Sequence, residues 1–159
     1  MNLFDRFKGT KRTSEDPVFG HLEYDNQSCW NGNVHFSPTG NEIAVAVVTG
    51  GPEPDDVHRA LFRELSERYG MLQPYIAKAL LDLWEPHLTE WHAESEPPHK
   101  SLPRTADDME RVTQLDSLAI EPGPYFHLTY GFRSEVGWDD AMLSVKVENW
   151  RVTPESLDD

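Results

Sequence analysis

Histidine is the residue type that offers this 159-residue chain the most chemistry, and seven are present. Three of them, His87, His92 and His99, lie among glutamates, which suggests a metal site. On a helix, however, residues five apart such as His87 and His92 point about 140° from each other, whereas two ligands four apart share a face. The spacing is typical of a solvated charged surface, so we expect no metal and no other cofactor.

A second group of histidines follows the alternation of strands. His21, His35 and His127 each fall on the polar parity of a strand-like run, and Tyr125 shares the parity of His127. Successive strand residues face opposite sides of a sheet, so neighbouring strands would gather these side chains on one polar face. That face is our candidate binding surface. The alternative is an antiparallel sheet that is covered on one side and simply leaves its other side in water.

Catalysis is a further hypothesis for the same face. His127 with Asp139 or Asp140 and a serine, Ser134 or Ser144, supplies the residue types of nucleophilic catalysis. The chain lacks the Gly-x-Ser-x-Gly elbow that exposes a serine nucleophile, and its glycines are not followed by the Lys-Ser/Thr of a phosphate loop. No catalytic residue is therefore assigned, and a small hydrolase using the polar face stays an alternative.

The five tryptophans divide between core and surface. Trp30 and Trp84 lie on apolar stripes, which predicts that they are buried. Trp138 precedes Asp139 and Asp140 in a predicted turn, and exposed tryptophan is enriched at the hot spots of protein interfaces. We therefore predict that residues 138–140 belong to the binding surface. The alternative is a Trp138 ring that folds back and caps the sheet.

The elements that position these residues are predicted from hydrophobic periodicity. Alternation typical of strands occurs over residues 18–24, 30–36, 43–49, 115–120, 125–132 and 141–148. Between the third and fourth runs, apolar residues recur every four positions, with Gly70 as the expected end of a first helix and Pro74 near the start of a second. The order βββ-αα-βββ predicts an α+β fold, with a helical hairpin packed on one face of a mainly antiparallel sheet.

The third strand-like run is apolar on both parities, which is typical of a central strand. Its alanines, Ala44 and Ala46, leave room for another group to pack closely. We divide the chain into a flexible basic N-terminal arm at residues 1–16, a single α+β domain at 17–152 and an acidic C-terminal tail at 153–159. One domain suits this length.

Net charge restricts the kind of partner. The formal charge is −14, and residues 1–12 carry four basic side chains against Asp5, a balance of +3, so the remaining residues carry −17. This acidity argues against nucleic acid, which is bound through basic patches. It favours a basic protein partner, because complementary charge speeds association. The alternative is that acidity only keeps the protein in solution.

The single cysteine, Cys29, permits no intrachain disulfide and is typical of a reducing compartment. No apolar run has the length of a signal-peptide core or of the roughly 18 residues that span a bilayer. We therefore expect a cytoplasmic protein without stable membrane insertion.

Several pieces of the chain resemble a known kind of domain. Phe19-Gly20-His21-Leu22 leads to Trp30-Asn31-Gly32, and a helical pair and a strand hairpin around Trp138 follow. This order resembles small bacterial domains of unknown function, some of which are similar to immunity proteins that neutralise toxins encoded beside them. The resemblance implies a non-catalytic binding or neutralising module for a protein partner. A small hydrolase and a ligand-binding regulatory domain are the alternatives.

Overall fold

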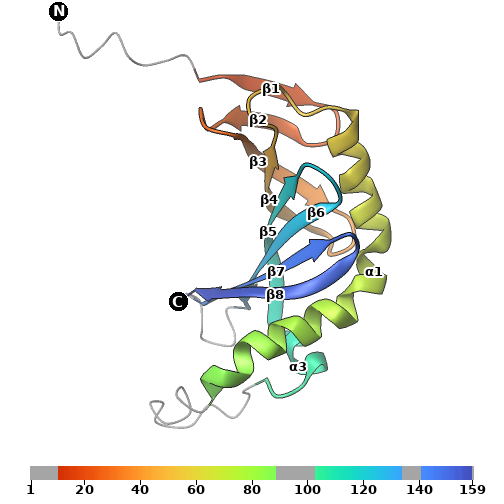
Figure 1. Ribbon diagram of the computed structural model, residues 1–159, viewed down its shortest axis with the longest axis vertical. Helices are drawn as coiled ribbons and strands as arrows, with labels where there is room; N and C mark the ends of the chain where they lie inside the picture. Colours follow the sequence, from red (N-terminus) through yellow and green to blue (C-terminus); the bar gives the residue numbers. More distant parts are fainter. Residues whose placement is uncertain (1–10, 89–102, 134–140, 159) are drawn as a thin grey trace, which may run out of the picture.

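The computed structural model of the chain describes residues 11–88, 103–133 and 141–158. The described residues form one eight-stranded sheet, two α-helices and a short 3-10 helix (Figure 1). The strands are β1 (Thr13–Asp16), β2 (Gly20–Tyr24), β3 (Cys29–Phe36), β4 (Asn41–Val48), β5 (Thr113–Glu121), β6 (Tyr125–Phe132), β7 (Met142–Glu148) and β8 (Arg151–Asp158). The helices are α1 (Asp56–Trp84), the 3-10 helix η2 (Glu85–His87) and α3 (Ala106–Val112).

The strands lie in the sheet in the same order as in the sequence. Every neighbouring pair is antiparallel except β4 and β5, which are parallel. Parallel neighbours need a crossover connection, and α1 and α3 lie within it. Figure 1 shows both helices on the same side of the sheet. The predicted α+β class and mainly antiparallel sheet are confirmed, and β4 is central, as its apolar composition indicates.

One hydrophobic core lies between α1 and the sheet. Leu65, Ile76 and Leu80 of α1 are buried together with Val45 and Val47 of β4. The inward residues alternate with exposed or half-buried ones along the strands, as a sheet covered on one face requires. Burial of Trp30 and Trp84, at 1% and 0% exposure, confirms their predicted place in the core.

The helical region differs from the predicted hairpin, because α1 is one helix of 29 residues with Pro74 inside it. It begins with a capping box in which Asp55 accepts hydrogen bonds from the amides of Val57 and His58. The predicted helix end at Gly70 is wrong. Proline at position i removes the hydrogen bond to the carbonyl at i−4, here Gly70, and pushes that carbonyl away. The helix tolerates this by changing direction along its length (Figure 1).

The two edge strands of the sheet, β1 and β8, lie in the segments that the sequence analysis treated as a terminal arm and a terminal tail. β1 belongs to the predicted arm, and most of β8 belongs to the predicted tail. Neither strand has an apolar alternation. The inward residue at the end of β1 is Asp16, and β8 contains Pro154 beside a register shift. Proline is tolerated at an edge because no ladder hydrogen bond is needed there.

Asp16 fastens the β1–β2 hairpin to α1. Its side chain is 2% exposed, lies 2.9 Å from the Arg59 guanidinium and accepts the amides of Val18 and Phe19. Burial acts to raise the pKa of Asp16, but the hydrogen bonds from Arg59 and from the two amides outweigh it and hold the pKa below its ordinary value. The carboxylate is therefore the charged partner that stabilises this edge of the sheet.

The turn between β7 and β8 is fastened to α1 in a different way. Asn149 and Trp150 both have positive φ, 49° and 64°, as the central residues of a two-residue hairpin of this type require. Positive φ is unfavourable for tryptophan. The Trp150 ring lies 5.5 Å from the Phe126 ring, and the Arg68 guanidinium of α1 lies 4.6 Å above it. These contacts offset the backbone cost and hold β8 against the helix.

Candidate functional site

The candidate site is the side of the sheet opposite the helices, which we call the open face. Among the described residues no helix covers it (Figure 1). Strand register aligns its side chains in rows across the sheet. One row contains Asn31, Ala46, Ala119, His127, Lys146 and Thr153, and the next contains Asn33, Ala44, Ser117, Thr129 and Ser144.

A shallow hollow lies where small side chains meet in the middle of the open face. Ala44 and Ala46 of β4 lie beside Ser117 and Ala119 of the parallel strand β5. The hollow has a volume of about 270 Å³, and His127 lies at its border. Four adjacent small residues leave the backbone unshielded, so a group from another molecule can approach the sheet closely. This position matches the space expected around the alanines of the third strand.

His127 is held between two carboxylates. Its Nδ1 atom lies 2.8 Å from Glu155 of β8, and its Nε2 atom lies 3.3 Å from Glu121 at the end of β5. The imidazole side chain is 25% exposed. With one carboxylate at each ring nitrogen, the ring orientation is fixed, so His127 presents one edge of a rigid polar cluster to the hollow.

Tyr125 extends this cluster. Its ring packs edge-on against His127 with centroids 4.9 Å apart, and the Lys146 ammonium lies 5.3 Å from the ring centre. Tyr125 is half-buried, which leaves part of the ring accessible at the surface. A tyrosine held on both sides is preorganised, so it loses little conformational entropy when a partner packs on it. Glu121, Glu155 and Lys146 were missed by the sequence reasoning, because only strand pairing brings them to His127.

The other predicted site residues are dispersed. His21 lies on the open face of β2 and pairs with Glu15 at 2.5 Å, and His35 lies opposite Glu42 near the β3–β4 turn. β2 and β6 are four strand positions apart, which separates His21 from His127 by about 19 Å. Trp138, Asp139 and Asp140 lie outside the described residues. The structure therefore joins Tyr125 to His127 and separates His21 and His35 from them.

Hydroxyl groups near His127 are paired with each other. The Thr129 and Ser144 oxygens lie 3.2 Å apart on neighbouring strands. A serine nucleophile needs a hydrogen bond to its general base, yet both ring nitrogens of His127 face carboxylates. Ser134, Asp139 and Asp140, the other members of the catalytic hypothesis, lie outside the described residues.

In residues 11–88, 103–133 and 141–158, no three His, Cys, Asp or Glu side chains gather in a group able to hold a metal ion. His92 and His99 lie outside those ranges, so the expectation of no metal stays a prediction. None of the helices described is both long and apolar enough to cross a bilayer.

A family match covers most of this architecture. Residues 16–145 match DUF2262, described as an uncharacterized protein conserved in bacteria. The chain belongs to DUF2262. The DUF2262 match includes the whole of the hollow and begins at Asp16, the residue that joins the β1–β2 hairpin to α1. It ends within β7, so Glu155 lies beyond it.

Membership of DUF2262 confirms the predicted resemblance to small bacterial domains of unknown function. No curated protein sequence and no solved structure matches the chain. Evidence for the function therefore lies in the site itself.

Proposed function

We propose that the open face binds a basic protein partner and that the chain is a non-catalytic binding or neutralising module of the immunity type. The observation that carries the proposal is the excess of carboxylates on a sheet face that no described helix covers. Its acidic residues include Glu15, Glu23, Glu42, Glu121, Glu148 and Glu155, against the basic residues Lys11, Lys146 and Arg151. The formal net charge of the whole chain, −14, is negative like the charge of the open face.

Tyr125 is the proposed anchor of the interface. Tyrosine is enriched among interface hot spots, and hot spots lie near the centre of an interface where water is excluded. His127 lines the hollow, and Tyr125 packs against His127, so a partner that places a side chain in the hollow can also cover Tyr125. Trp138, Asp139 and Asp140 are proposed to extend this surface, and His21 and His35 to lie at its far side.

The proposed mechanism is occlusion. A carboxylate-rich surface pairs with a basic site on the partner and keeps other molecules from that site. Exposed ion pairs contribute little affinity, so the charges select the partner and speed its approach, whereas the contacts at the hollow and Tyr125 hold it. We further propose that this occurs in the cytoplasm, where a single free cysteine, Cys29, is suited to reducing conditions.

A small hydrolase on the same face has less support, because the carboxylates at both nitrogens of His127 occupy the positions where a nucleophile would bind. The ligand-binding alternative has support from a different part of the molecule, a cavity between α1, α3 and the sheet.

The test begins with capture of partners from the native bacterium, identification of the captured protein and reconstitution with both proteins purified. Tyr125→Ala should then weaken binding at least about tenfold, as expected for a hot spot. The matched control is Tyr75→Ala, which removes a 67% exposed tyrosine from α1 on the other side of the sheet. A partner bound equally well by both variants, or one that is itself acidic, would contradict the proposal.

A further inference from the structure

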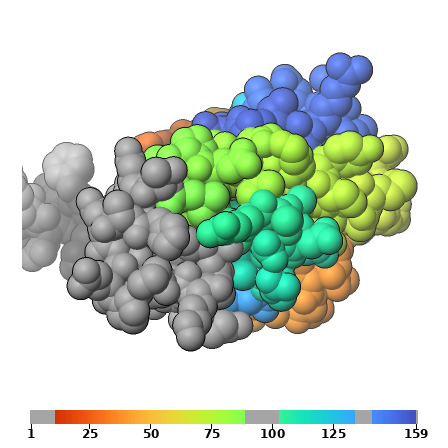
Figure 2. Space-filling model, turned by 90° about the horizontal axis from the view of Figure 1, so that it is seen from below, coloured from red at the N-terminus to blue at the C-terminus, as the bar shows by residue number. Residues whose placement is uncertain are grey.

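A cavity on the helix-covered side of the sheet is separate from the open face. It has a volume of about 160 Å³ and lies between α1, α3, the β3–β4 turn and the strands β5 and β6. Figure 2 shows α3 against α1 at this end of the molecule, with the turn after β3 nearby. A cavity of about 150 Å³ holds a molecule of the size of benzene, so this one suits a ligand with a body of that size.

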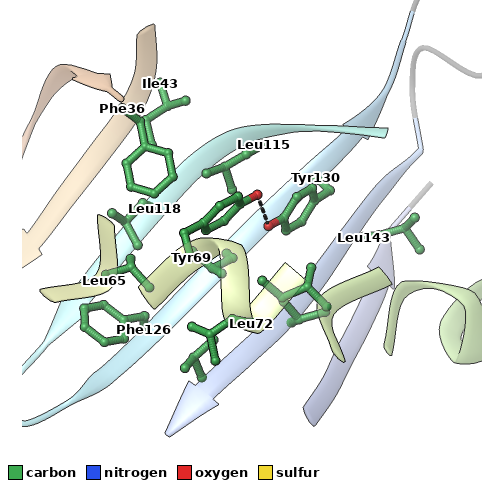
Figure 3. Packing of buried hydrophobic residues seen from close by; sticks show 14 of the residues in the cluster. Phe36, Ile43, Leu65, Tyr69, Leu72, Leu115, Leu118, Phe126, Tyr130 and Leu143 are labelled. Carbon is green, nitrogen blue, oxygen red and sulfur yellow. Dashed lines mark hydrogen bonds between the residues drawn. The ribbon is translucent and has the colours of Figure 1, made fainter. Parts of the chain in front are cut away.

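Two tyrosine hydroxyls meet at the buried side of the cavity. Tyr69 of α1 and Tyr130 of β6 are both 4% exposed, and their oxygens lie 2.9 Å apart (Figure 3). Burial raises the pKa of both tyrosines above the ordinary value, and the nearby Glu110 carboxylate adds to the shift of Tyr69. Both hydroxyls therefore keep their protons at neutral pH.

One hydroxyl hydrogen of the tyrosine pair is not used in the hydrogen bond between the two side chains. Two protonated hydroxyls carry two hydrogens, and the bond between them uses one. Among the described residues neither hydroxyl has a hydrogen-bond partner other than its fellow tyrosine. A buried donor is stabilised when a hydrogen-bond partner is supplied, and the cavity is the open space beside this donor. The site therefore favours a ligand with an acceptor atom.

The rest of the lining separates into an apolar wall and a charged rim. Ile76, Ala77 and Leu80 of α1 form the wall. Arg133 and Glu110 are exposed at the rim, where the Arg133 amide donates to the carbonyl of Val112, two residues after Glu110. In the part of the chain that the structure describes, neither charge is engaged in an ion pair. The rim thus offers a cation and an anion at the same end of the cavity.

We propose that this cavity binds a free α-amino acid with an apolar side chain of about leucine size. The carboxylate accepts from the tyrosine pair and pairs with Arg133. The ammonium pairs with Glu110, and the side chain packs on the α1 wall. One amino acid then provides a partner for the tyrosine pair, for Arg133 and for Glu110. A carboxylic acid without an ammonium group leaves Glu110 without a partner, and an amine without a carboxylate leaves the tyrosines and Arg133 without one.

The test is titration of L-leucine into the full chain, followed by the NMR shifts of backbone amides. Leucine should shift the amides of residues that line the cavity, such as Ala77 and Leu115. Leucinamide lacks the carboxylate that accepts from the buried tyrosines, so it should bind at least about tenfold more weakly. N-acetyl-leucine lacks the ammonium that pairs with the exposed Glu110, so it should bind about two- to fivefold more weakly. Absence of shifts at millimolar leucine, or equal binding of the three compounds, overturns the proposal.

Three variants and their controls locate the site. Tyr130→Phe, which removes a buried hydroxyl, should raise the dissociation constant at least about tenfold. Arg133→Gln and Glu110→Gln, which remove exposed charges, should each raise it about two- to fivefold. The controls Tyr75→Phe, Arg63→Gln and Glu67→Gln make the same chemical changes outside the cavity and should leave the dissociation constant unchanged. If Tyr130→Phe lowers the melting temperature, Tyr69→Phe replaces it. Loss of binding in the controls, or unchanged binding in the cavity variants, contradicts the assignment. Because the cavity and the open face lie on opposite sides of the sheet, this result is independent of partner binding.

Discussion

At the scale of single residues, a few side chains explain motifs that look unremarkable in the sequence. The Trp30-Asn31-Gly32 triplet is an example. Trp30 is buried and donates from its indole nitrogen to the carbonyl of Pro52 at 2.7 Å. Gly32 lies opposite Leu22 in the sheet, where a Cβ atom would lie 2.5 Å from the carbonyl oxygen of His21. The glycine is required because the backbone of β2 passes so close to it.

A pair of glycine substitutions tests this explanation. Gly32→Ala should destabilise the protein by about 1–3 kcal/mol, because β2 must move away from β3 to admit the methyl group. Gly70→Ala is the matched control: nothing lies near its Cβ position, and its place in α1 predicts a gain of up to about 1 kcal/mol. Chemical denaturation of both variants measures the two effects. Equal changes for the two would contradict the close approach of β2.

Asp16 leads to a prediction about pH. Its pKa is lower in the folded protein than in the unfolded chain, so its stabilising effect is present above pH of about 4 and is lost as pH falls through the folded pKa. Asp16→Asn should cost about 2 kcal/mol at neutral pH, as for hydrogen bonds to a charged group. It should also flatten the fall of the unfolding free energy below pH of about 4. Denaturation at several pH values checks this, with exposed Asp107→Asn as control. The prediction is wrong if both variants follow the wild-type curve.

At the scale of elements, hydrophobic alternation located six of the strands, because each buries one face in the common core. It missed β1 and β8, because edge strands of this sheet are short, polar or interrupted by proline. It also divided α1 at Gly70, since glycine followed by proline is the usual end of a helix. Continuous packing of Leu65, Leu72 and Leu80 outweighs that local preference here.

Truncation tests whether β1 is a structural element. The test compares a chain that lacks residues 1–10 with a chain that lacks residues 1–16. The second chain additionally lacks β1, the Asp16–Arg59 pair and the two residues before the strand. The longer deletion should have a melting temperature lower by about 5–10 °C, since about 2–4 °C is lost per kcal/mol in a protein of this size. Similar melting temperatures for the two chains would mean that residues 11–16 add little to stability.

At the candidate sites, the sequence predicts which side of a strand a residue faces but not which distant residues it contacts. The parity of His127 and Tyr125 was readable, because it depends only on alternation within one strand. The carboxylate of Glu155 lies 28 residues from His127, and Tyr69 lies 61 residues from Tyr130. Such contacts depend on strand order and on the path of the crossover, which alternation does not contain. The cavity beside the tyrosine pair has no signal in the sequence for the same reason.

At the scale of the whole molecule, the sheet divides the protein into two sides with different chemistry. The helix side holds the core and a partly open cavity with charges at its rim. The open face holds small and polar side chains with an excess of carboxylates. A large shallow surface suits a macromolecule, whereas a concave cavity of one-ring size suits a small molecule. The two proposals therefore occupy different surfaces and do not compete.

The charge of the whole molecule predicts how binding of a basic partner depends on salt. Electrostatic attraction extends over the Debye length, which falls from about 30 Å at 0.01 M salt to about 8 Å at physiological strength. The association rate should therefore drop steeply with salt while the dissociation rate changes little. Charge reversal separates the faces: Glu42→Lys on the open face should slow association more than Glu67→Lys on α1, although both change the net charge equally. Stopped-flow kinetics with the identified partner measures both rates. An association rate that does not change with salt, or that is equal in the two variants, would contradict the electrostatic basis of the proposed interface.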